Sequence, residues 1–179
     1  KALAGTAYLP PEIQAQRAWL ARWQGREQPR VQHPRLAVFV ANHGVARLAP
    51  PSQPMTALLP RLVDPNGALA GQVASVDADF RLYEMNLAEP SADFAQGQPA
   101  MAAKTCVQAI TYGMMAVDNG LDVLALAASG DGQDLAAATL LAALTAAPLA
   151  ETLRICGADA AYAAALQPAL DAATGSQPL

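Results

Sequence analysis

The chain has 179 residues, of which 53% are hydrophobic and 15% charged, with a net charge of -4. This length and composition predict a single domain, residues 1–179, with a sizeable core. Its 11 Lys and Arg residues are scattered, which argues against nucleic acid as a partner. No apolar run reaches the roughly 18 residues of a membrane span, and the first five residues do not resemble a signal peptide. We therefore expect a cytoplasmic protein without a membrane partner.

Two further predictions follow from the composition: one from the low number of charged residues, the other from the low number of Cys and His residues. A surface with so little charge leaves apolar area uncovered, which favours an oligomer, although alanine accounts for much of that area. Two cysteines and two histidines are too few for a four-ligand zinc site without carboxylates. We expect no metal, no cofactor, and reduced, mostly buried thiols at Cys106 and Cys156.

The first elements of the chain follow from its prolines and its apolar runs. Pro10 and Pro11 before Glu12 are typical of a helix start, and this helix is expected to end at Gly25. The continuous apolar run 36–41 predicts a strand buried on both faces. Further helices are expected over 55–62 (broken by Pro60 or Pro65), 68–76, 100–117, 133–144 and 158–173 (interrupted by Pro168), and further strands over 80–85, 121–127 and 153–156.

The long helix 100–117 has its own predicted details. Met101, Cys106, Ile110, Met114 and Val117 would share one apolar face, and Asn119–Gly120 would supply a left-handed cap. The polar tail 174–179 is typical of a natural chain end.

Strands that alternate with helices predict an α/β protein: a Rossmann-like three-layer fold with a mainly parallel sheet. Ligands of such sheets bind beyond the carboxyl ends of the strands. This rule selects three places: 42–44, 84–86 and 128–132.

The loop Ser129-Gly130-Asp131-Gly132 has two interpretations. Glycines before a helix N-terminus can cradle a phosphate. However, Asp131 and Asp134 direct negative charge at that position, and the spacing fits neither a P-loop nor GxGxxG. These observations favour an aspartate that caps the following helix.

His43 and Glu84 stand at two other strand ends. His43 is a general base, a donor to a ligand, or a histidine that satisfies its own loop; without a partner acid, the last is slightly favoured. Glu84 is a carboxylate at the ligand edge or a solvated strand end. The absence of a GxSxG elbow gives little support to triad hydrolysis.

Several motifs in order resemble the nicotinate-nucleotide:dimethylbenzimidazole phosphoribosyltransferases. The stretch 36–46 is similar to that family's first strand and its N/D-H-G-V-A loop. The stretch 121–138 is similar, without gaps, to its D-L-L-x-x-G-E-M-G-I-G-N-T-T-A-A-A motif. Shorter similarities, at 19–25, 66–70, 89–93 and 99–101, extend the resemblance from residue 10 to residue 145.

The resemblance implies a function and an assembly. Such enzymes transfer phosphoribose from nicotinate mononucleotide to 5,6-dimethylbenzimidazole, for the lower ligand of cobalamin, and are typically homodimers with a Rossmann-like fold. A nucleotide or a benzimidazole is therefore the expected ligand. Of the expected ligand-binding residues, Asn42, His43, Gly44, Gly130 and Gly132 match the family's motifs. Ser129 and Asp134 are added only because the topology places them at the ligand edge.

The chain also departs from the family pattern at its chemical positions. The functional glutamate of the loop corresponds to Ala128, and the N-T-T group to residues 133–135, whereas Gly130 and Gly132 persist. The resemblance covers about the first half of a family-length protein, so the chain is truncated relative to the family. No residue corresponds to the family's proposed C-terminal general base.

Three hypotheses follow, and they leave open whether the chain is an enzyme. The first is a degenerate member with little or no catalysis that binds a nucleotide, a base or a partner. The second is an active phosphoribosyltransferase in which His43, Glu84 or Asp131 replaces the lost acid. The third is an assembly or regulatory subunit without a small ligand, which would have a filled pocket.

Overall fold

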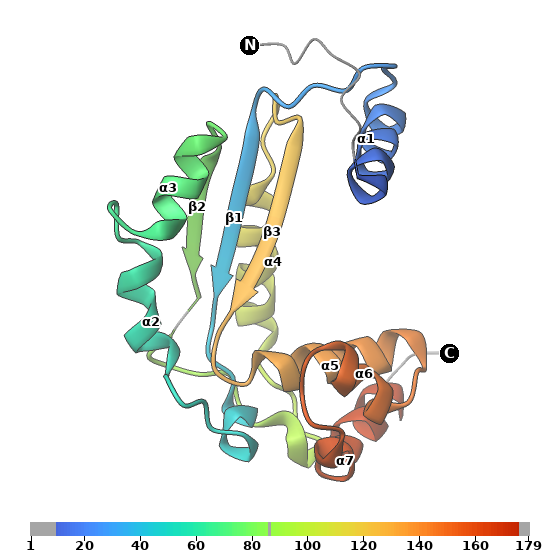
Figure 1. The fold of residues 1–179 in the computed structure, drawn as a ribbon. Helices are drawn as coiled ribbons and strands as arrows, with labels where there is room; N and C mark the ends of the chain where they lie inside the picture. The colour runs from blue at the N-terminus through green and yellow to red at the C-terminus, as the bar shows by residue number, and fades with distance from the viewer. Residues whose placement is uncertain (1–9, 86, 176–179) are drawn as a thin grey trace.

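A computed structural model describes residues 10–85 and 87–175 of the chain (Figure 1). The predictions for Asn86, for the first five residues and for the end of the polar tail lie outside these residues. Within the described part, no helix is both long enough and apolar enough to cross a membrane.

Three parallel strands form one sheet in the order β2-β1-β3 (Figure 1). They are β1 (Pro34–Val40), β2 (Asp79–Glu84) and β3 (Val123–Ser129). Val40 is in register with both Glu84 and Ser129, so the three strands end at a common edge. The central strand β1 buries Ala37, Val38 and Val40, as its continuous apolar run predicted.

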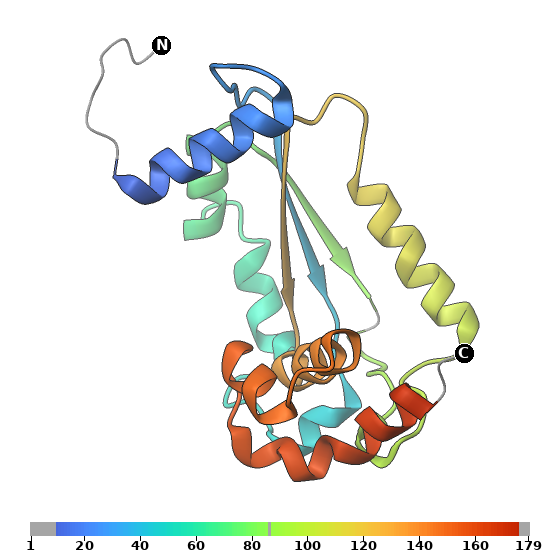
Figure 2. The ribbon, with the colours of Figure 1, turned by 90° about the vertical axis from the view of Figure 1, so that its right-hand side faces the viewer.

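Helices lie on both faces of the sheet, which confirms the predicted α/β three-layer class, although residues 125–128 of β3 are exposed. Figure 2 shows α4 on one face, and α2 and α3 on the other. Helices α5, α6 and α7 lie beyond the carboxyl ends of the strands, and α1 lies toward the opposite end. The bounds are α1 (Pro11–Gln24), α2 (Met55–Leu62), α3 (Ala68–Ser75), α4 (Ala103–Ala116), α5 (Gln133–Thr145), α6 (Leu149–Ile155) and α7 (Ala163–Gly175).

Two apolar clusters hold these layers in place. Val38 and Val40 of the sheet pack with Met55 of α2 and with Leu87. The second cluster lies among the helices beyond the strand ends and contains Val45, Ala95, Leu135, Ala138, Ala142, Leu149, Leu153 and Leu166. The loops at the carboxyl edge are thus fixed between two packed clusters.

The predicted strand at 153–156 is wrong, because these residues belong to helix α6 and its C-cap. Leu149, Thr152 and Leu153 are buried, and their spacing of three and then one is helical. The apolar run is too short for its spacing alone to distinguish a strand from a helix. The packing of α6 against α5 is what makes it helical.

Prolines and glycines also act differently from the prediction. Pro60 lies inside α2 and Pro168 inside α7, so neither ends its helix. The C-cap of α4 is Val117, in an extended conformation. Gly120 does have a positive φ of 99°, but it lies in the loop beyond this cap. Pro11 and Gly25, in contrast, begin and cap α1 as predicted.

Two helices expose side chains of their predicted apolar stripes. Trp23 of α1 is 73% exposed, and Met114 of α4 is 70% exposed. The thiol prediction is wrong for Cys106, which is also exposed on α4, while Cys156 is partly buried. A helical apolar stripe predicts a contact surface, and for α1 and α4 that surface has no partner within the described residues.

Candidate functional site

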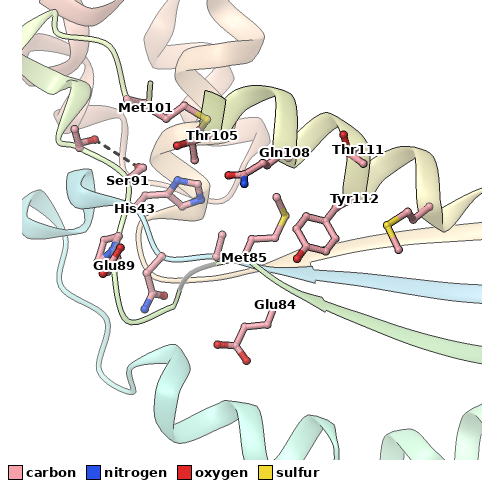
Figure 3. A pocket seen from close by; sticks show the side chains of 17 residues that line it. His43, Glu84, Met85, Glu89, Ser91, Met101, Thr105, Gln108, Thr111 and Tyr112 are labelled. Carbon is pink, nitrogen blue, oxygen red and sulfur yellow. Dashed lines mark hydrogen bonds between the residues drawn. The ribbon is translucent and has the colours of Figure 1, made fainter. Parts of the chain in front are cut away.

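A pocket of about 720 Å³ lies at the carboxyl edge of the sheet, between the strand ends and α4 (Figure 3). Its volume lies within the range of ordinary small-molecule sites. One wall is formed by residues 41–43, 84–85, 89–92 and 100–101, and the other by Thr105, Gln108, Ala109, Thr111, Tyr112 and Met115 of α4.

His43 is the predicted site residue whose position best suits a ligand contact. Its imidazole points toward Thr105 and Gln108 of α4 (Figure 3). Its backbone N–H donates to the carbonyl of Asp131, at 2.9 Å, and its backbone forms a parallel bridge with Ser91. Burial lowers the pKa of His43 below the ordinary value of 6.5, so the ring is neutral near pH 7.

Asn42 and Glu84 also line the pocket, but with different consequences. The amide of Asn42 serves the scaffold: Nδ2 donates to the carbonyl of Leu87, and Oδ1 accepts from the backbone of Asp131, both at 3.0 Å. Glu84 is exposed at the end of β2, and its carboxylate points away from α4 (Figure 3). Of the two side chains, only that of Glu84 keeps its polar atoms available.

Asp131 occupies a structural position outside the pocket. Its Oδ1 accepts from the backbone N–H of Met55, at 2.8 Å, at the first turn of α2. The sequence predicted an aspartate that caps α5, yet the N-cap residue of α5 is Gly132, which offers no side-chain cap. Asp131 thus caps α2, a helix that lies earlier in the chain. The backbone of Asp131 is itself held in place by its hydrogen bonds with residues 42 and 43.

The other loop residues also lie outside the pocket. The hydroxyl of Ser129 donates to Sδ of Met55, and Asp134 is exposed in the first turn of α5. A Cβ on Gly130 would lie 1.5 Å from the carbonyl oxygen of Ala41, so this position requires glycine. Gly132 has a φ of 75°, in the left-handed region that favours glycine.

The predicted site residues are therefore only partly brought together. Asn42, His43 and Glu84 meet at the pocket, whereas Ser129 and Asp131 lie outside it and hydrogen-bond to Met55 of α2. Gly44 also serves the scaffold, since its N–H donates to the carbonyl of Ser91 at 2.9 Å. Within the described part of the chain, no group of three or more His, Cys, Asp or Glu residues is placed to hold a metal.

Sequence reasoning missed the polar side chains that α4 gives to the pocket. Thr105, Gln108 and Tyr112 follow one another at spacings of three and four, and therefore lie on one helical face. The sequence did carry this signal, but the prediction followed the apolar face of the helix. Glu89 and Ser91, in the irregular connection before α4, complete the polar part of the lining.

A parallel sheet between helices, with a pocket at its carboxyl edge, defines a Rossmann-like α/β protein. The chain matches the model of a phosphoribosyltransferase family over residues 12–165. It therefore belongs to that phosphoribosyltransferase family.

Similar proteins are consistent with this assignment. The nicotinate-nucleotide–dimethylbenzimidazole phosphoribosyltransferase of Brucella anthropi is 32% identical over 130 residues, which are 71% of this chain and 38% of that protein. The enzyme of the same name from Brucella canis gives the same figures. The chain thus spans well under half the length of these relatives.

The fold is similar to that of a solved structure. In the crystal structure of CobT from Thermus thermophilus, 59% of the chain superposes on 95% of this one, with a TM-score of 0.66 and 22% identity. A second crystal structure of the phosphoribosyltransferase from this organism gives a TM-score of 0.62. This likeness concerns the fold alone.

Proposed function

We propose that this chain is a degenerate member of the phosphoribosyltransferase family that binds a benzimidazole-like base, with little or no turnover. The observation that carries the proposal is the pocket between the strand ends and α4, in which both walls combine apolar and polar side chains. The named activity of the relatives, which act on a nucleotide and on dimethylbenzimidazole, supports this choice of ligand.

The lining of the pocket suits a flat heteroaromatic ring. Met85, Met101, Tyr112 and Met115 supply apolar and aromatic surface, on which such a ring can stack. His43 and Gln108 supply side-chain nitrogen and oxygen atoms that can bond the ring nitrogens. A few polar groups within an apolar lining are the usual composition of a small-molecule site.

The charges of the pocket favour a base over a phosphate. Glu84 and Glu89 line it, while no Lys or Arg of the described residues does. Phosphate sites rely on cationic side chains or on free backbone N–H groups. The backbone N–H of Asp131, in the loop that would cradle a phosphate, already donates to Asn42. Nicotinate mononucleotide should therefore bind more weakly than a free benzimidazole.

The groups that would support turnover are replaced or occupied. Ala128 stands where the loop of the family has a glutamate, and alanine neither accepts nor donates a proton. Asp131, the nearest carboxylate in that loop, caps α2. These two observations support weak or absent catalysis.

A thermal-shift series with dimethylbenzimidazole, nicotinate mononucleotide and α-ribazole phosphate tests the binding proposal. A ligand that binds only the folded chain raises the melting temperature by mass action. Of the three ligands, dimethylbenzimidazole should give the largest shift in melting temperature. With this ligand, Gln108→Ala should shift less than the unmutated chain. Val107→Ala, one residue away and outside the lining, is the matched control and should keep the full shift. No shift at millimolar ligand would refute the proposal.

The second candidate function is an active transferase with rearranged groups. Its support is that His43, Glu84 and Glu89 line one pocket, so a neutral imidazole and two carboxylates are available for proton transfer. Turnover of nicotinate mononucleotide with dimethylbenzimidazole should then fall in His43→Ala or Glu84→Ala. If alanine at positions 43, 84 and 131 leaves the rate unchanged, this candidate fails.

An assembly subunit without a ligand is the third candidate, and the open pocket with its polar lining argues against it. We propose that the chain is nevertheless a homodimer, because its charge is low and α1 and α4 expose apolar side chains. Size-exclusion chromatography with light scattering tests this assembly. The single-domain organisation and the cytoplasmic location stay predictions.

A further inference from the structure

Within the described part of the chain, two side chains of the sheet hydrogen-bond to the last turn of α4. The hydroxyl of Tyr83, on β2, donates to the carbonyl of Met115 at 3.1 Å. Nη1 of Arg35, on β1, donates to the carbonyl of Ala116 at 3.0 Å. Because the last four carbonyls of a helix have no partner inside the helix, these two donors attach α4 to the sheet near its C-terminal end.

Tyr83 also packs against α4 through its ring. The rings of Tyr83 and Phe39, which are register partners on β2 and β1, are stacked with centroids 4.9 Å apart. The ring of Tyr112, on α4, lies edge-on to that of Tyr83, with centroids 6.2 Å apart. Aromatic pairs of this kind favour a defined geometry beyond the apolar area that they bury. A continuous aromatic contact therefore joins the central strand, through Tyr83, to α4.

Tyr83 lies next to the pocket without lining it. Its two contacts on α4, Tyr112 and Met115, both line the pocket. Met85, two residues after Tyr83, projects from the same face of the sheet and points toward α4 (Figure 3). A part of the pocket therefore lies between Met85 at the strand end and these two side chains of α4, directly beside the contacts of Tyr83.

We propose that Tyr83 fixes the distance between α4 and the sheet, and thereby makes the pocket select a flat ring over a thicker, puckered one. Tyr83 is a positioning residue, since it acts on the ligand only through Tyr112 and Met115. A gap of about 0.5–1 Å already loses about a quarter to a half of a van der Waals contact, so a small displacement of α4 is enough to remove this selection. The inference rests on the proposed function, which puts an aromatic base in this pocket, and it adds the residue that decides which rings fit.

Arg35 also holds α4, but its removal has wider effects. Its guanidinium pairs with Asp79 of β2 at 2.7 Å, and it lies at the opposite end of the sheet from the pocket. The hydroxyl of Tyr83, in contrast, can be removed without a change of ring or charge. Tyr83→Phe therefore alters the attachment of α4 close to the pocket and leaves the sheet intact.

The test compares benzimidazole with tetrahydrobenzimidazole, whose carbocycle is saturated and puckered, by isothermal titration calorimetry at a pH at which both are neutral. The two molecules share their skeleton and both nitrogens, and the unmutated chain should bind the flat one more tightly. Tyr83→Phe should reduce this preference by about threefold to tenfold, which corresponds to the loss of one ordinary hydrogen bond. Tyr162→Phe removes a hydroxyl among the helices beyond the strand ends, outside the pocket, and is the matched control that should keep the full preference.

A second measurement needs no ligand. The amides of Met115 and Ala116, in the last turn of α4, should exchange at least about threefold faster in Tyr83→Phe than in the unmutated chain or in Tyr162→Phe. The role of Tyr83 is overturned if this exchange does not change, or if both ligands lose affinity equally and the preference persists. It is equally overturned if Tyr162→Phe reduces the preference as much as Tyr83→Phe does. If the unmutated chain binds neither ligand, the proposed function fails, and this inference fails with it.

Discussion

Asp131 offers the sharpest test of whether the loop after β3 has a structural or a chemical role. Asp131→Ala removes the acceptor of the Met55 N–H, at the first turn of α2. Met55 is 1% exposed, so water cannot easily replace the carboxylate. A hydrogen bond to a charged group contributes about 1.5–3 kcal/mol, and the loss of a cap alone costs about 1 kcal/mol. We expect Asp131→Ala to cost about 2 kcal/mol.

This loss can be measured as a shift in melting temperature. For a chain of this size, 1 kcal/mol corresponds to about 2–4 °C, so the expected decrease is about 4–8 °C. Asp131→Asn keeps an acceptor oxygen and should cost less than about 0.5 kcal/mol. Far-ultraviolet circular dichroism is the suitable signal, because Trp19 and Trp23 both lie exposed on α1 and report little on the core. If Asp131→Ala melts normally but loses ligand binding or turnover, the structural assignment is wrong.

Three further predictions rest on buried or crowded groups, and two of them include a control substitution. Arg35→Met removes a buried guanidinium that pairs with the partly exposed Asp79 and donates to the carbonyl of Ala116, and it should cost about 1–3 kcal/mol in urea unfolding. The exposed Arg81→Met should cost less than about 1 kcal/mol. Gly130→Ala should cost more than about 3 kcal/mol or abolish folding, because its Cβ meets backbone; Gly113→Ala, in open space, should stabilise by up to about 1 kcal/mol. The lowered pKa of His43 means that the unfolded chain binds this proton more readily, so stability should fall as pH drops below 6.5. In His43→Gln, the melting temperature should therefore vary less with pH between about pH 5 and 8 than in the unmutated chain. An equal variation with pH in both chains would contradict the burial of this ring.

The sheet could be predicted from the sequence because buried parallel strands are continuous apolar runs. All three strands were found within two residues of their observed ends. The error at 153–156 arose because a short apolar run has no period of its own, and only the contact with α5 makes it helical. The exposure of residues 125–128 of β3 could not be predicted from the sequence either. An apolar run predicts a buried strand, whether or not helices cover that strand.

The candidate site was only partly predictable, for a related reason. The rule that ligands bind beyond the strand ends found His43 and Glu84, which line the pocket. The same rule also selected Asp131, whose partner Met55 is far away in the sequence. Gln108 was missed because its role depends on the position of α4 over the strand ends.

The exposure of α4 has a consequence for the energetics of its pocket. Among the side chains of this 14-residue helix, only Ala116 is buried, and an isolated helix of this length is marginal in water. Thr105 and Gln108 therefore belong to a wall that opens at little cost. Any ligand must spend part of its interaction energy on ordering this wall, so a tightly bound ligand would be seen first as slower amide exchange along α4.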